Sequence, residues 1–343
     1  MMRALLLFLA ALLVAQDPPI DPARARELLR KQRAGETLAP DEAAYLKRAM
    51  EERRGATPPR APRETSGLKP LDEMGVDDRY QGEDGGLYGG GKNVPSDELR
   101  RAAEAELARI APLDAAGKPA PDGRVVLLSI SMSNATQEFS HFKRLADVDP
   151  AKAAGLTIVD GAQGGQAMAE WAPPEAAPWA EAERRLKAAG VSTAQVQVAW
   201  IKLANKSPSG DLAAHGGKLR KDTQAVLQNA KARFPNLRIA YLSSRIYGGY
   251  ATSNLNPEPY AYESAFVVRG LIREQKDGPV LLWGPYLWAD GTTPRKSDGL
   301  VWTREDLAKD GTHPSESGKD KVARLLLNFF KSDPLAKPWF AAR

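Results

Sequence analysis

Short, almost wholly apolar runs alternate with helical stretches over much of this chain, and this alternation constrains its fold more than any other feature. A strand with one face in water is apolar at every second position, whereas these runs are apolar nearly throughout, which indicates burial on both faces. The intervening helices supply the crossover connections that parallel strands need. We therefore predict an α/β fold with a central parallel sheet of about five strands. The predicted strands cover residues 125–130, 156–159, 196–201, 237–242 and 280–283.

The first residues have the pattern of an export signal. Arg3 precedes an apolar run from Ala4 to Ala15 that is too short to span a bilayer comfortably. We expect cleavage near residue 16 and an exported chain, periplasmic or extracellular, with no membrane span after cleavage. An uncleaved anchor is the alternative, because Leu13 is larger than the small residue that usually stands three positions before a cleavage site.

Two helical patterns follow, over residues 23–33 and 40–54, and they predict a small helical hairpin. Consecutive prolines after the second pattern disfavour helix and strand alike, so we expect a linker there. The predicted parts are a signal peptide at 1–16, a helical hairpin extension at 17–55, a Pro/Gly-rich linker at 56–96 and the sheet domain at 97–343.

The composition excludes several functions. The 343 residues contain no cysteine, which rules out disulfides, thiolate nucleophiles and zinc–thiolate sites. A metal centre built on imidazoles would need nearly all of the three histidines, and no cofactor is indicated. The net charge of +5 is spread along the chain without a block of like charges, so nucleic acid is not an expected partner.

Serine, glycine and asparagine follow the first three predicted strands, where a parallel sheet binds its ligands. Ser133 precedes a helix, so its hydroxyl is exposed and its N–H lies at the positive helix end; Ser131 is the alternative nucleophile, and a plain helix cap is the structural alternative. Gly165 can bring its N–H close to a substrate oxygen, although turn formation alone also explains it. Asn205 can donate its amide to an oxyanion or end the strand through an Asx turn.

Asp310 and His313 stand just before the last amphipathic helix, separated by Gly311 and Thr312. A tight turn over three residues lets the Asp310 carboxylate reach Nδ1 of His313, which leaves Nε2 free to act as a base. A structural histidine at a helix start is the alternative. The spacing makes this pair the candidate acid–base element of the chain.

Taken together, these four blocks resemble the SGNH hydrolase family, also called GDSL-like esterases, over roughly residues 125–330. The resemblance implies a three-layer α/β/α, flavodoxin-like fold. With the export signal, we interpret the chain as a divergent exported bacterial member of this family. It implies Ser133 as nucleophile and Asp310 with His313 as acid–base pair. It also implies oxyanion donors from the N–H of Ser133, the N–H of Gly165 and the amide of Asn205, with Gly164 the next choice after Gly165.

The chain departs from the family pattern at two blocks. Ser131-Met132-Ser133 stands where the family usually has Gly-Asp-Ser, and Leu203-Ala204-Asn205-Lys206 stands where it has Gly-x-Asn-Asp. The missing first-block aspartate removes a common supporting contact and leaves the nucleophile in place.

Four residues near the predicted strand ends are candidates for substrate contact: Gln166, Tyr247, Tyr262 and Trp288. Aromatic rings beside carboxylates and amides suit sugar faces, and half-buried packing is the alternative. The predicted function is an exported serine esterase that acts on a small-molecule or polysaccharide ester, with carbohydrate esters as the preferred class. A non-catalytic exported glycan-binding protein is the second hypothesis.

Overall fold

The computed structural model describes residues 20–33, 36–56, 61–275 and 277–342. The chain divides into two compact units, at residues 1–59 and 60–343. In the first unit, α1 (Pro22–Arg33) packs on α2 (Pro40–Ala56), with the Arg24 guanidinium 4.5 Å from the centre of the Tyr45 ring. The predicted helical extension is therefore present, while the predicted signal peptide at 1–16 lies outside the described residues.

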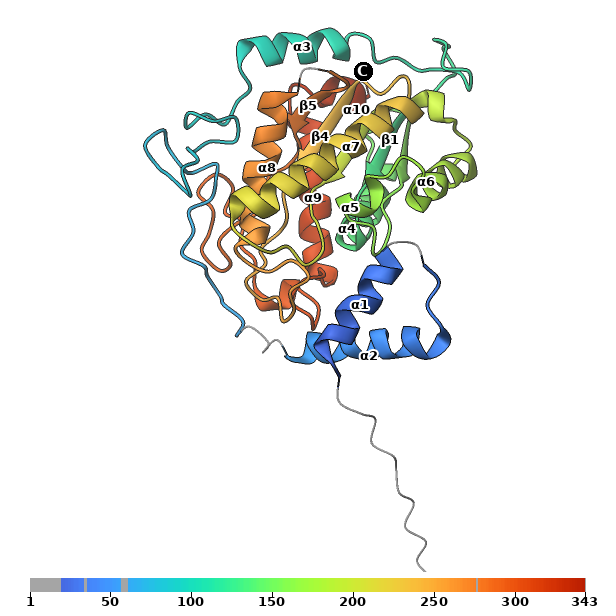
Figure 1. Ribbon diagram of the computed structural model, residues 1–343. Coiled ribbons are helices and arrows are strands. Elements are labelled where there is room, and N and C mark those ends of the chain that lie inside the picture. Colours follow the sequence, from blue (N-terminus) through green and yellow to red (C-terminus); the bar gives the residue numbers. More distant parts are fainter. Residues whose placement is uncertain (1–19, 34–35, 57–60, 276, 343) are drawn as a thin grey trace, which may run out of the picture. The chain divides into compact units, whose positions relative to one another are not determined.

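A five-stranded sheet forms the centre of the second unit (Figure 1). All neighbouring strands are parallel, and their spatial order is β2-β1-β3-β4-β5, the flavodoxin-like order. The predicted α/β fold class is confirmed. The strands are β1 (Val125–Ile130), β2 (Leu156–Asp160), β3 (Val196–Lys202), β4 (Ile239–Ser243) and β5 (Val280–Trp283).

Helices cover both faces of this sheet because the chain reverses its direction of travel across the sheet once (Figure 1). The step from β1 to β2 runs one way and the later steps run the other way, and right-handed crossovers then place the connecting helices on opposite faces. The helices of the second unit are α3 (Asp97–Leu107), α4 (Ser133–Asp147), α5 (Met168–Trp171), α6 (Ala177–Ala188), α7 (Gly217–Arg233), α8 (Tyr260–Glu274), α9 (Glu316–Ser332) and α10 (Lys337–Phe340), with short helical turns η1 (Thr193–Gln195), η2 (Leu212–Gly216) and η3 (Arg304–Asp306).

The core lies between the sheet and these helices. Phe139 of α4 stacks on Trp200 of β3 with ring centres 5.4 Å apart, and Phe142 meets Phe330 of α9 at 5.4 Å. All four rings are fully buried. Burial of each large apolar side chain stabilises the fold by about 1.5–3 kcal/mol, so α4 and α9 are held firmly to the sheet and to each other.

The segment predicted as a linker, residues 56–96, differs from that prediction. From residue 61 onward it belongs to the second unit. Leu71 and Met74 are buried in the core, the Ser66 hydroxyl donates to Asp290, and the Tyr80 hydroxyl donates to Glu263 at 2.6 Å. Proline and glycine do prevent regular structure here, as expected, but an irregular segment with apolar side chains can still pack against a sheet domain.

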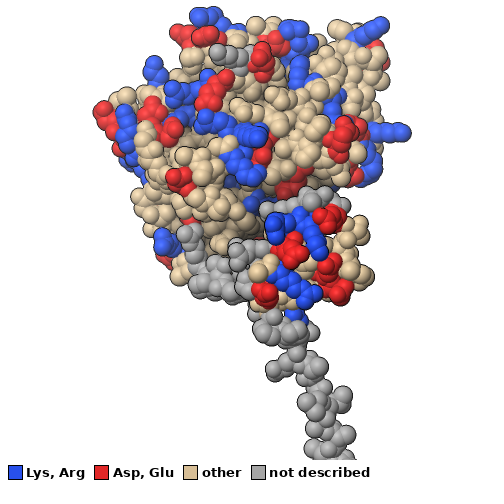
Figure 2. Space-filling view, viewed as in Figure 1, with Lys and Arg blue, Asp and Glu red and all other residues tan. Residues whose placement is uncertain are grey.

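The surface carries both signs of charge. On the face shown in Figure 2, Lys and Arg are interspersed with Asp and Glu, without a continuous basic area among the described residues. Within the described chain, no helix combines the length and apolar character needed to cross a bilayer.

Candidate active site

The loops that follow β1, β2 and β3 meet at the carboxyl edge of the sheet, because all the strands run in the same direction. Gly165 and Asn205 belong to these loops, Ser133 begins α4 directly after the first of them, and His313 reaches the same place from the segment before α9. All four line one cavity of about 230 Å³. The structure thus brings together residues that are up to 180 positions apart in the chain.

Ser133 is the first residue of α4, and its Oγ lies 2.8 Å from Nε2 of His313. The N–H groups in the first turn of a helix have no acceptor within the helix, and the helix dipole makes this end positive. The N-cap, Met132, has no side-chain hydrogen bond to these groups. The N–H of Ser133 is therefore placed to stabilise negative charge that develops beside its own hydroxyl.

Ser131 has a different environment, although it stands only two positions earlier. It is fully buried, and its hydroxyl donates to the carbonyl oxygen of Lys202. Residues two apart can face opposite ways where a strand ends and a helix begins. The structure therefore places Ser133, and not Ser131, beside His313.

The predicted pairing of Asp310 with His313 is present in the structure. Asp310 Oδ2 lies 2.5 Å from His313 Nδ1, and Oδ1 accepts the N–H groups of Thr312 and His313, each at 3.0 Å. The turn requires Gly311, whose φ is +63° and whose added Cβ would lie 1.7 Å from the carbonyl oxygen of Tyr250. A side chain at this position would displace the turn that carries His313.

The charge state of Asp310 follows from its contacts. Burial would raise the pKa of this carboxyl, but the hydrogen bonds from His313 and from the two backbone N–H groups outweigh burial and lower the pKa below its usual value. Asp310 is thus ionised at neutral pH. An ionised acceptor at Nδ1 fixes the tautomer in which Nε2 has no hydrogen and can accept the Ser133 proton.

Asn205 is oriented by two hydrogen bonds. Its Oδ1 accepts the N–H of Ala169 at 2.9 Å, and its Nδ2 donates to Asp222 of α7 at 2.6 Å. Because an amide nitrogen carries two hydrogens, one hydrogen remains after the bond to Asp222. The residue lines the cavity, which makes this hydrogen the candidate oxyanion donor.

Gly165 also lines the cavity. Its φ is +75°, a left-handed conformation that favours glycine, and its carbonyl accepts Lys206 Nζ at 3.0 Å. This contact orients the peptide from the carbonyl side. Gly164 follows β2 as well, but it is not among the cavity-lining residues.

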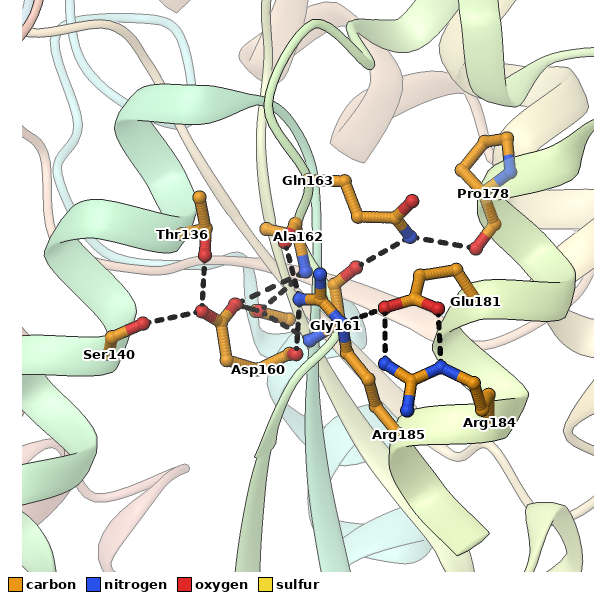
Figure 3. A network of polar contacts seen from close by, with 11 residues as sticks. Thr136, Ser140, Asp160, Gly161, Ala162, Gln163, Pro178, Glu181, Arg184 and Arg185 are labelled. Carbon is orange, nitrogen blue, oxygen red and sulfur yellow. Dashed lines mark hydrogen bonds and ion pairs between the residues drawn. The ribbon is translucent and has the colours of Figure 1, made fainter. Parts of the chain in front are cut away.

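Asp160, at the end of β2, holds this loop to α4 (Figure 3). Its carboxylate accepts hydroxyl hydrogens from Ser129 at 2.6 Å, Thr136 at 2.5 Å and Ser140 at 2.7 Å. Arg185 of α6 donates to the backbone carbonyl of the same residue at 3.0 Å. Asp160 thus joins β1, β2, α4 and α6 close behind the Ser133 loop, a role that the sequence analysis did not assign. The feature of the sequence that could have indicated this role is a charged residue, Asp160, at the end of an apolar strand.

The four residues predicted to contact substrate do not line the cavity. Tyr247, Tyr262 and Trp288 are each 1% exposed or less, and their polar tips are already bonded. Tyr262 and Trp288 pack on each other with ring centres 4.7 Å apart. Gln166 uses its backbone in the loop, where its carbonyl accepts the Trp171 indole N–H. The expected aromatic rim is therefore wrong, because these rings pack inward, and the glycan-binding hypothesis loses the feature that favoured it.

Arg245 and Asn256 are among the cavity residues that were not predicted as site residues. Arg245 follows β4 and Asn256 lies in the loop before α8, and both line the cavity. Asn256 Nδ2 donates to the backbone carbonyl of Asn205 at 3.1 Å, and Asn256 Oδ1 accepts Arg245 Nε at 3.1 Å. The position of Arg245 directly after a parallel strand could have indicated a site residue. The prediction instead chose the neighbouring tyrosine, Tyr247.

The fold and the site together define a three-layer parallel α/β protein with a hydrogen-bonded Ser–His–Asp group at the carboxyl edge of its sheet. No family model matches the chain, and no curated protein matches it. Among solved structures, an acetyl esterase variant with an acetate ion is similar with a TM-score of 0.37 and 11% identity, over 59% of this chain and 94% of that one.

Two further solved structures are similar at the same level. An acylhydrolase, described as putative, from Bacteroides fragilis has a TM-score of 0.34 and 14% identity, over 68% of this chain and 97% of that one. The periplasmic domain of a lipopolysaccharide acetyltransferase from Salmonella ser. Paratyphi A has a TM-score of 0.35 and 14% identity, over 68% of this chain and 96% of that one. These likenesses are remote, and the site described above stands on the geometry of this chain.

Proposed function

We propose that this protein is a serine hydrolase of carboxylic esters, with Ser133 as nucleophile, His313 as base and acid, and Asp310 as the group that orients His313. The 2.8 Å contact between Ser133 Oγ and His313 Nε2 carries the proposal. A nucleophile within hydrogen-bond reach of a base that a third group orients is the arrangement nucleophilic catalysis requires. The SGNH resemblance, seen in the sequence over residues 125–330, supports the same roles.

The proposed reaction proceeds in two halves. His313 Nε2 takes the Ser133 proton as Oγ forms a bond to the ester carbonyl carbon, and the resulting oxyanion is stabilised by the N–H of Ser133, the N–H of Gly165 and the amide of Asn205. His313 then gives its proton to the leaving alcohol as the carbon–oxygen bond breaks. Water, deprotonated by His313, attacks the acyl-enzyme and releases the acid, and Ser133 recovers its proton.

We propose further that the chain is exported, on the evidence of residues 1–16 alone. Fractionation of cells that express the full chain, with mass spectrometry of the mature N-terminus, tests this proposal. That the ester belongs to a carbohydrate stays a prediction. The aromatic residues that favoured a carbohydrate are buried, so they do not support it.

Labelling with a fluorophosphonate probe tests the esterase proposal. The reagent couples to an activated serine and not to an idle one. We expect the wild-type chain to be labelled on the peptide that contains Ser133, as located by mass spectrometry. Labelling should be lost in Ser133→Ala and retained in the matched control Ser131→Ala, whose hydroxyl bonds to the Lys202 carbonyl instead of His313. A folded wild-type chain that is not labelled contradicts the proposal, as does label on Ser131.

A further inference from the structure

Arg245 is a buried cation on the wall of the cavity that holds Ser133 and His313. The residue is 3% exposed, and buried charges in proteins are normally paired with an opposite charge. Its backbone N–H donates to Ser264, and its Nε donates to Asn256. Within the described residues, the guanidinium makes no ion pair.

Carboxylates near Arg245 are engaged with other groups. Both oxygens of Glu138 accept from Lys202 Nζ, at 2.7 and 2.6 Å, in a fully buried pair. Asp310 is bonded to His313. Glu258 accepts the N–H groups of Gly248 and Trp288. These three carboxylates attract Arg245 from a distance but do not contact it. The guanidinium therefore lacks the direct acidic partner that its burial calls for.

The terminal nitrogens of Arg245 open to solvent at the cavity. Buried side-chain atoms without a hydrogen-bond partner occur in the described chain at Asp72, His141, Arg220 and Arg238, and not at Arg245. The two terminal nitrogens of Arg245 also have no hydrogen bond within the described residues. Since they are not among the buried atoms that lack a partner, they are exposed to solvent. Because the rest of Arg245 is buried and the residue lines the cavity, solvent reaches these nitrogens through the cavity.

The cavity as a whole favours negative charge. Lys206 is its second cationic lining residue, with Nζ 2.8 Å from Glu170, and the lining residues include no aspartate or glutamate. Burial lowers the pKa of Arg245 to about 10, so the guanidinium remains charged at neutral pH. A planar guanidinium with two free nitrogens matches the geometry of a carboxylate.

We propose that Arg245 binds a carboxylate of the substrate, and that the natural substrates are esters with such a group close to the scissile bond. This inference rests on the proposed esterase function and specifies its substrate class. The carboxylate belongs either to the acyl group, as in a dicarboxylic half-ester, or to the alcohol, as in an acylated uronic acid. Arg245 is thus a specificity-determining residue, beyond its bond to Asn256.

Matched pairs of esters test the proposal by kinetics. 4-Nitrophenyl succinate and 4-nitrophenyl pentanoate differ in a terminal carboxylate on the acyl side, and acetylated methyl glucuronide and acetylated methyl glucoside differ on the alcohol side. We expect wild type to prefer the anionic member of one pair. Arg245→Met should lower kcat/KM for that ester about 30- to 1000-fold, mainly through KM, and should affect the neutral ester much less.

Two further variants separate specificity from positioning. Arg245→Lys keeps the charge and should retain part of the preference. Lys206→Met removes the cation already paired to Glu170 and should leave the ratio between the two esters unchanged, whatever its effect on turnover. Wild type without a preference in either pair overturns the proposal. An equal loss for anionic and neutral esters in Arg245→Met also overturns it, since Arg245 would then act only through Asn256 and Asn205.

Binding to the Ser133→Ala protein tests the site without turnover. By calorimetry, monomethyl succinate or methyl glucuronide should bind, dimethyl succinate should not, and Arg245→Met should abolish binding. Absence of anion binding by the folded protein overturns the inference even where fluorophosphonate labelling supports the esterase. Anion binding without labelling supports the carboxylate site at Arg245 and overturns the esterase proposal alone. If Arg245→Met does not fold, inhibition of wild-type ester hydrolysis by monomethyl succinate and by dimethyl succinate is compared instead. Equal inhibition by the two compounds overturns the proposal.

Discussion

At the scale of single residues, the site depends on which hydroxyl reaches the histidine. Ser131 and Ser133 have the same chemistry, yet one donates to a backbone carbonyl in the core and the other lies 2.8 Å from His313. Asn205 is a similar case. Both an Asx turn and an oxyanion donor were compatible with its position in the sequence. In the structure Asn205 lines the cavity, and its bonds to Ala169 and Asp222 use its oxygen and one of its two amide hydrogens.

Replacement of Asn205 by alanine measures the oxyanion role at this scale. We expect kcat for a 4-nitrophenyl ester to fall about 10²- to 10³-fold with a small change in KM, because the amide acts on the transition state and not on the bound ester. Asn229→Ala on α7 is the matched control, since that amide donates to the Ala172 carbonyl away from the cavity and should leave kcat unchanged. A fall of less than about fivefold for Asn205→Ala would mean that Asn205 only supports the loop.

At the scale of elements, the segment between η3 and α9 carries His313 and is held by Asp306. Its carboxylate accepts the Thr303 N–H and the Ser317 hydroxyl, each at 2.9 Å, and it pairs with Lys321 of α9. Its backbone carbonyl accepts the N–H of Ser315 at 2.9 Å. Burial would raise the pKa of Asp306, but Lys321 and the two hydrogen bonds outweigh burial and hold the pKa below its usual value of 3.8.

This shift predicts the pH dependence of one part of the stability. A carboxyl whose pKa is lower in the folded state stabilises the fold above its unfolded pKa, and this contribution is lost as the pH falls through the folded pKa. Asp306→Asn should therefore lower the free energy of unfolding by about 1–3 kcal/mol at neutral pH, and the difference from wild type should shrink below about pH 4. Urea unfolding of wild type and Asp306→Asn at several pH values measures the loss of stability and its dependence on pH.

The control for Asp306 is Glu316→Gln. Glu316 is an exposed residue in the first turn of α9 that pairs with Lys319, and exposed ion pairs contribute little. Its replacement should scarcely change the stability at any pH. A difference between Asp306→Asn and wild type that is the same in acid and at neutral pH would show that the ionised carboxylate does not stabilise this segment.

At the scale of the whole molecule, the boundary between the two units decides which residues the sheet domain needs. The second unit contains the complete candidate site and also residues 61–96, most of the segment predicted as a linker. Ser66 and Gly67 donate to the Asp290 carboxylate, and Leu71 donates its N–H to the Tyr286 hydroxyl at 3.1 Å. These contacts make the segment part of the folded domain.

Two truncations test this boundary. A chain that starts at residue 60 should keep its melting temperature and its fluorophosphonate labelling, because the whole second unit remains. A chain that starts at residue 97 loses the buried side chains of Leu71 and Met74, each of which contributes about 1.5–3 kcal/mol, against a total stability of about 5–15 kcal/mol for a typical domain. It should melt at a much lower temperature or fail to fold. Equal melting temperatures for the two chains would restore the linker interpretation.

The sequence by itself determined the strands, their parallel pairing and the residues that follow them. Apolar runs such as Val125–Ile130 can only be buried on both faces, and the spacing of Asp310 and His313 sets a local turn, so both features depend on neighbouring residues alone. The order of the strands then brought Ser133, Gly165, Asn205 and His313 to one cavity, as the family resemblance implied.

Only the tertiary structure decided which polar and aromatic side chains face the cavity. Tyr247, Tyr262 and Trp288 point into the core, while Arg245, two positions before Tyr247, lines the cavity. Asp160 and residues 61–96 likewise acquired their roles from partners far away in the chain. The direction of a side chain in a loop depends on packing against distant segments, which no local pattern of residues records.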